Sequence, residues 1–87
     1  MILTREQELV LGAIAGLSRE DAGVPVMIYD VHHSFRDMDV SDLVPHLGVL
    51  LDSGLIRNAR PTREKISNMY LLTPEGLAYY RNIKKSS

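Results

Sequence analysis

The residues best suited to bind another molecule are four cations in the second half of the chain. Arg57, Arg60, Arg63 and Lys65 lie close together around a proline. Cations in such a cluster can contact the phosphates of a duplex or reach into its minor groove. The other interpretation is that they are ordinary solvated charges at the tip of a hairpin. Both interpretations place the four side chains on the surface.

Three histidines form the second group of residues that could take part in metal binding or catalysis. His32 and His33 are adjacent, Asp30 precedes them, and His46 lies further along the chain. Neighbouring side chains on a helix point about 100° apart, so the adjacent pair cannot easily share a metal ion. The sequence also has no Cys, no glycine-rich phosphate loop and no nucleophile elbow. We therefore expect no metal site, no cofactor and no enzymatic activity.

Composition indicates a small globular protein. A chain of 87 residues with 45% hydrophobic residues can close one core, so we expect a single domain over 1–87. The lack of Cys excludes disulfides and suits a reducing cytoplasm. The charged residues within 1–20 are unlike a secretory signal, and the apolar stretches are too short for a membrane span. Because the net charge is -1, any face that binds DNA must be local.

The first half of the chain has the pattern of three helices. A helix is predicted over 5–18, since Thr4 and Gln7 can form a capping box and apolar residues follow at helical spacing. Its expected core row is Leu9, Ala13 and Leu17, with Val10 and Ile14 alongside. A second helix is predicted over 26–36. The third is predicted over 42–53, capped by Ser41 or Asp39, buried through Leu43, Leu47, Leu50 and Leu51, and ended by Gly54.

The pattern changes after Gly54. Two short strands, 55–59 and 67–72, are predicted to form a β-hairpin over 55–72. Thr73 then caps a final helix over 74–84, with Pro74 in its first position. This order of elements predicts an α+β fold of the winged helix-turn-helix type, in which the third helix is the recognition helix and the hairpin is the wing.

Two segments carry a resemblance to a known family. The stretch LVPHLGVLLDSGLI at 43–56 is similar to the third helix of PadR-like winged-helix transcriptional regulators, and YLLTPEG at 70–76 is similar to their junction between wing and last helix. The chain departs from the family pattern at Val44, where an aromatic residue is usual, and at Ile28, where Gly is usual. It resembles a small form without the long C-terminal dimerisation region. The resemblance implies a regulator that binds double-stranded DNA as a homodimer.

In such a regulator the solvent side of helix 42–53 would meet the major groove. On the helical wheel, the residues turned outward are Ser41, Asp42, Pro45, His46, Val49 and Asp52. None of them is Arg or Lys. The commonest specific base contact is therefore missing from this helix. The full expected set is Ser41, Asp42, Pro45, His46, Val49, Arg57, Arg60, Arg63 and Lys65.

Two alternatives stay open from the sequence. The acidic and apolar side of helix 42–53, including Pro45, Val49 and Asp52, also suits an interaction module that binds a protein partner and little or no DNA. In the last helix, Leu77, Tyr80 and Ile83 share one side and can contact a second subunit. The same side can instead pack onto its own domain, because so short a chain needs its apolar area for the core.

Overall fold

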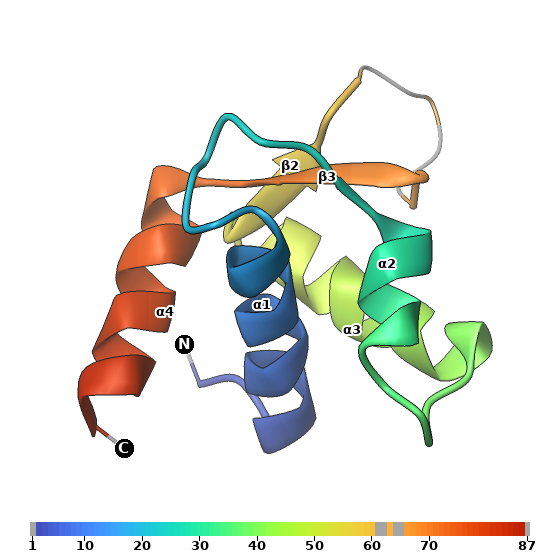
Figure 1. Cartoon of the computed structure of the whole chain (residues 1–87), viewed down its shortest axis with the longest axis horizontal. Coiled ribbons are helices and arrows are strands. Elements are labelled where there is room, and N and C mark those ends of the chain that lie inside the picture. The colour runs from blue at the N-terminus through green and yellow to red at the C-terminus, as the bar shows by residue number, and fades with distance from the viewer. Residues whose placement is uncertain (1, 61–62, 64–65, 87) are drawn as a thin grey trace.

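A computed structural model describes residues 2–60, 63 and 66–86 of the chain. These residues form an α+β fold with four helices and one three-stranded antiparallel sheet (Figure 1). In chain order the elements are α1 (Arg5–Leu17), β1 (Val26–Met27), α2 (Ile28–His33), α3 (Val40–Asp52), β2 (Ile56–Asn58), β3 (Met69–Leu72) and α4 (Pro74–Ser86).

The sheet is built around the predicted hairpin. The strand order is β1-β3-β2, with Ile56 opposite Leu72 on one side of β3 and Val26 opposite Tyr70 on the other. The strands of the hairpin are shorter than expected, although the Ala59 amide still donates to the Met69 carbonyl oxygen over 3.0 Å. Figure 1 shows the sheet lying across one end of the helices.

The prediction of one helix over 26–36 is wrong. Val26 and Met27 form the edge strand β1, and the helix that follows covers only Ile28–His33. The Ile28 amide donates to the Asn68 carbonyl oxygen over 2.9 Å, which holds this junction against the hairpin. A strand is stabilised by its neighbours in the sheet, and the partner of β1 lies far along the chain. The local sequence therefore contains no sign of the pairing.

Helix α1 begins as predicted and buries the second of its two predicted rows, Val10 and Ile14, more deeply than the first. The Gln7 amide donates to the Thr4 hydroxyl oxygen over 3.2 Å, and Gln7 Oε1 accepts from the Thr4 amide over 2.9 Å, which confirms the capping box. Leu9 and Leu17, expected in the core, are 49% and 42% exposed. Because α1 packs against both α3 and α4, the covered face of the helix is rotated away from Leu9 and Leu17. Its buried residues are Val10, Leu11, Ile14 and Ala15.

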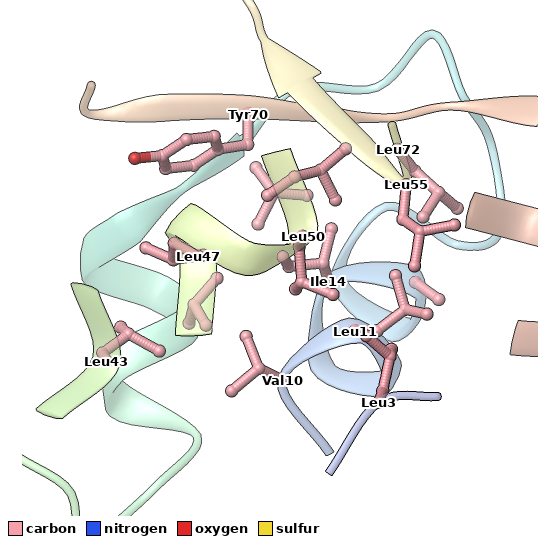
Figure 2. Close-up of a cluster of buried hydrophobic side chains, with 14 residues drawn as sticks. Leu3, Val10, Leu11, Ile14, Leu43, Leu47, Leu50, Leu55, Tyr70 and Leu72 are labelled. Carbon is pink, nitrogen blue, oxygen red and sulfur yellow. The ribbon is translucent and has the colours of Figure 1, made fainter. Parts of the chain in front are cut away.

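The core lies where three elements meet. Figure 2 shows side chains from α1, α3 and the hairpin converging on one cluster. Leu43, Leu47 and Leu50 of α3 are completely buried, as predicted, whereas Leu51 lies at the edge of the cluster. The predicted inner face of α3 is therefore confirmed in its main row, and the opposite face is turned to solvent.

Both ends of α3 are defined by local hydrogen bonds. The helix starts at Val40, two residues before the predicted start, because Asp39 and not Ser41 is the N-cap. At the other end Gly54 has a φ of 73°, the left-handed conformation that was predicted from its type. The Leu55 amide donates to Leu50 and the Gly54 amide to Leu51, over 3.0 and 3.1 Å. This is a Schellman motif, and it turns the chain directly into the hairpin.

Helix α4 begins at the predicted position and runs two residues further than expected. The Gly76 amide donates to the Thr73 hydroxyl oxygen over 2.9 Å, which confirms Thr73 as the cap. Gly76 is required at this point, because a Cβ there would lie 1.9 Å from the Leu55 carbonyl oxygen. In the ranges described, none of the helices has the length and apolar character needed to cross a bilayer.

Candidate nucleic-acid interface

The outer face of α3 is exposed but carries no cation. Ser41, Asp42, Pro45 and Val49 are exposed, as predicted from the helical wheel, and His46 is partly buried beside them. Asp42 Oδ2 accepts a hydrogen bond of 3.2 Å from the Asp39 amide. This bond holds one carboxylate at the first turn of α3, the end of a recognition helix that is closest to the bases.

The charges around α3 are mostly negative. The segment 28–53, which spans α2 and α3, contains a single Arg, Arg36, and no Lys. Its carboxylates are Asp30, Asp37, Asp39, Asp42 and Asp52. Carboxylates near a helix N-terminus stabilise the helix but cancel its attraction for other anions. The N-terminal end of α3 is therefore poorly suited to attract phosphate.

His46 offers one polar atom to a ligand. Its Nδ1 is buried and has no hydrogen-bond partner within the described residues. The Nε2 edge is therefore the part of the ring that can reach a base or a phosphate. The His46 ring and the Ser41 hydroxyl are hydrogen-bonding groups of this face that are not carboxylates.

Several exposed cations lie on the hairpin. Arg57, Arg60 and Arg63 are exposed, and no carboxylate of the described residues forms an ion pair with them. Arg57 stands opposite Leu71 in the sheet and follows the buried Ile56, so alternation turns its side chain away from the core. The fourth predicted cation, Lys65, lies outside the described residues.

A hydrogen-bond network links the two sides of the hairpin at the loop end of its strands. The Ser67 hydroxyl lies 2.7 Å from Asn58 Oδ1 and 2.9 Å from the Met69 carbonyl oxygen. The Ser67 amide donates to the hydroxyl oxygen of Tyr70 over 2.9 Å. Tyr70 is completely buried, and burial raises the pKa of its hydroxyl. Ser67 and Asn58 were not predicted from the sequence, because nothing in their types indicated a shared network.

A cleft opens beside this network. It has a volume of about 350 Å³ and is lined by Met27, Arg60, Ser67, Asn68 and Met69. We call it the hairpin cleft. Of these residues only Arg60 was expected at a binding site. The cleft was missed because Met27 was assigned to a helix, and only its pairing with Met69 brings the two methionines to one face of the sheet.

A second hollow, which we call the helix groove, lies between α1, α4 and the end of α2. Its volume is about 530 Å³, and it is lined by Arg5, Glu8, Leu9, Gly12, Ala13, Ser34, Phe35, Tyr80, Ile83 and Lys84. Two of the three expected dimer residues, Tyr80 and Ile83, line it, and all three, including Leu77, are partly buried against the core. A Cβ on Gly12 would lie 3.6 Å from Tyr80 Cε1, so α4 also packs onto α1 of its own chain.

The histidines of α2 lie beside an exposed aromatic ring. The centroids of Tyr29 and His33 are 4.3 Å apart, and the His32 ring lies 6.3 Å from that of His33. Across the described parts of the chain, no three His, Asp or Glu side chains are grouped so that they could hold a metal ion.

No protein-family model matches the chain, and comparison with curated proteins and with solved structures gives no match either. The resemblance to PadR-like regulators therefore stays a prediction from the motifs at 43–56 and 70–76.

Proposed function

We propose that this chain is a cytoplasmic, non-enzymatic transcription regulator that binds double-stranded DNA through a winged helix-turn-helix fold of the PadR-like type. The observation that carries the proposal is the set of exposed arginines on the hairpin, Arg57, Arg60 and Arg63, which have no carboxylate partner among the described residues. The order of helices and strands supports it, since the hairpin directly follows an exposed helix.

The two surfaces have different roles in this proposal. The hairpin arginines contact phosphates and supply most of the affinity. Helix α3 lies in the major groove, where Ser41 and His46 donate or accept hydrogen bonds and Pro45 and Val49 contact apolar edges of bases. Because this face has no Arg or Lys, we expect modest discrimination between sequences and a large share of binding that does not depend on sequence.

A homodimer would bring two such surfaces to one duplex. The helix groove supports this part of the proposal, because apolar side chains line part of it and it remains partly open. Leu9, on its wall, is 49% exposed. Its rim carries Arg5 and Glu8, so a second copy related by a two-fold axis can place opposite charges together. Sedimentation equilibrium of the wild type and of Leu9→Glu tests the dimer. A monomer at every concentration of the wild type would exclude it.

Fluorescence anisotropy with a random duplex, repeated across a salt series, tests DNA binding. We expect micromolar affinity at low salt and a steep loss as salt rises. The double variant Arg60→Ala with Arg63→Ala should weaken binding to all sequences and reduce the salt slope by about two. Arg19→Gln, which removes one positive charge from the exposed turn after α1, is the control and should change binding much less. Absence of binding at low salt would refute the proposal.

One observation favours a second candidate, a module that binds a protein. The exposed side of α3 combines apolar Val40 and Val49, which are 47% and 37% exposed, with nearby carboxylates. Such a face suits a partner segment that is basic and partly apolar. Saturable binding of a lysine-rich peptide that Asp42→Asn weakens, together with no binding of duplex DNA, would favour this function.

A further inference from the structure

We propose that the hairpin cleft is a preformed seat for one sugar-phosphate unit of the DNA backbone, separate from the α3 face. The inference rests on the proposed function and specifies where the backbone binds. It moves part of the DNA contact onto β1 and the adjoining start of α2, which no motif in the sequence had indicated.

The polar groups of the cleft are suited to phosphate. Arg60 contributes a guanidinium group with several donors, and Asn68, which is exposed, contributes a side-chain amide. Among the described residues, no carboxylate lines the cleft. A phosphodiester offers charge and acceptors without donors, so it complements these groups. The volume of about 350 Å³ lies at the lower end of the range of ligand sites and suits a small unit.

The floor of the cleft is apolar and suits a sugar. Met27 and Met69 are directly opposite each other on paired strands, so their side chains lie on the same face of the sheet. Met27 is 47% exposed, because alternation along β1 turns it to the outer face of the sheet, opposite the buried Val26. Thioether side chains adapt their shape to a ligand, and here they would contact deoxyribose carbons while Arg60 holds the phosphate.

The cleft is held in shape before any ligand binds. The Asn68 carbonyl oxygen accepts from the Ile28 amide over 2.9 Å, which ties the hairpin to the junction of β1 and α2. Ser67 is fixed by Asn58 and by the buried Tyr70. A site that needs little ordering loses less entropy on binding. In Figure 1 the start of α2 lies beneath the hairpin end of β3.

The neighbouring α3 is a poorer seat for the backbone. Asp42 is bonded to the Asp39 amide at its first turn, so carboxylate already occupies the end where phosphate would otherwise be attracted. In the hairpin cleft, the group that would meet the phosphate is the cation of Arg60 and not a carboxylate.

Methionines provide a direct test in the wild-type chain. With ¹³C-methyl methionine, NMR spectra recorded during titration with a duplex report Met27 and Met69 in the cleft, and Met38 directly before the N-cap of α3. The proposal predicts that the methyl resonances of Met27 and Met69 shift during the titration. The apparent affinity obtained from these shifts should equal the affinity obtained from anisotropy. If DNA binds and only Met38 shifts, or neither cleft methionine shifts, the seat is elsewhere and the proposed function still stands. If the duplex does not bind at all, the proposed function fails.

A charge placed in the cleft gives a second test. Met27→Glu puts a carboxylate beside Arg60 at an exposed position and should weaken DNA binding by at least about tenfold. Ile2→Glu is the matched control, since Ile2 is 95% exposed and the change in charge is the same. Thermal unfolding followed by circular dichroism verifies that both variants fold. Equal affinities of the two folded variants would overturn the proposal, and if Met27→Glu does not fold, the methionine titration decides.

Discussion

The hydroxyl group of Thr73 donates a hydrogen bond of 2.6 Å to the carbonyl oxygen of Gly54. The two residues lie at opposite ends of the hairpin, one just after α3 and the other just before α4. The Thr73 amide also donates to Leu55 over 3.1 Å. This pair of bonds closes the hairpin at its base, so the direction of the arginine-bearing strands is set relative to α3.

Replacing Thr73 should therefore affect two elements together. In Thr73→Val the hydroxyl that caps Gly76 and bonds to Gly54 is lost, at a buried position of nearly unchanged shape. We expect the free energy of unfolding to fall by about 1 to 3 kcal/mol, measured by urea denaturation. Thr73→Ser keeps the hydroxyl and should lose much less. Equal losses in both variants would mean that the methyl group, and not the bonds, matters.

Two glycines in helices should respond in opposite directions to the same substitution. A Cβ on Gly16 of α1 would meet nothing within 4 Å, so Gly16→Ala should raise the free energy of unfolding by about 0.5 to 1 kcal/mol. At Gly76 the Cβ would collide with the Leu55 backbone, so Gly76→Ala should lower it by at least about 1 to 3 kcal/mol. Urea denaturation of both variants checks this. A stable Gly76→Ala protein would contradict the close contact of α4 with the end of α3.

Tyr70 should make stability fall at alkaline pH. Burial raises its pKa above the ordinary value of 10.0, and the hydrogen bond from Ser67 only partly opposes this. The folded state therefore favours the neutral hydroxyl. Its contribution is complete below pH 10 and is lost as pH rises through the folded-state pKa. Absorbance at 295 nm should show one tyrosine ionising later than an ordinary tyrosine, and Tyr70→Phe should remove that step. A titration unchanged by Tyr70→Phe would contradict the assignment.

Asp42 should oppose DNA binding. Asp42→Asn removes a negative charge from the first turn of α3 but keeps an oxygen that can accept from the Asp39 amide. On the proposed DNA function, affinity for a duplex should rise about three- to tenfold at low salt, measured by anisotropy. Asp21→Asn is the control, since Asp21 also accepts from a backbone amide, that of Gly23, in an exposed loop. If Asp42→Asn, and not Asp21→Asn, instead weakened the binding of a lysine-rich peptide, the function as a module that binds a protein would be favoured.

The sequence by itself determined where α1 and α4 start and where α3 stops. Thr4, Gly54 and Thr73 were identified correctly because each makes its capping bonds, or adopts its special φ, within a few residues of its own position. The inner row of α3 and the exposure of Arg57, Arg60 and Arg63 also followed from local pattern and residue type.

The tertiary structure alone decided what depends on partners distant in the chain. Val26 and Met27 form a strand because Met69 and Tyr70 offer them an edge. Leu9 of α1 is exposed because the positions of α3 and α4 select which row is covered. The hairpin cleft exists for the same reason, since its methionines meet only through strand pairing. Local propensity acts over a single turn or strand, whereas pairing and burial depend on surfaces that come together only in the folded chain.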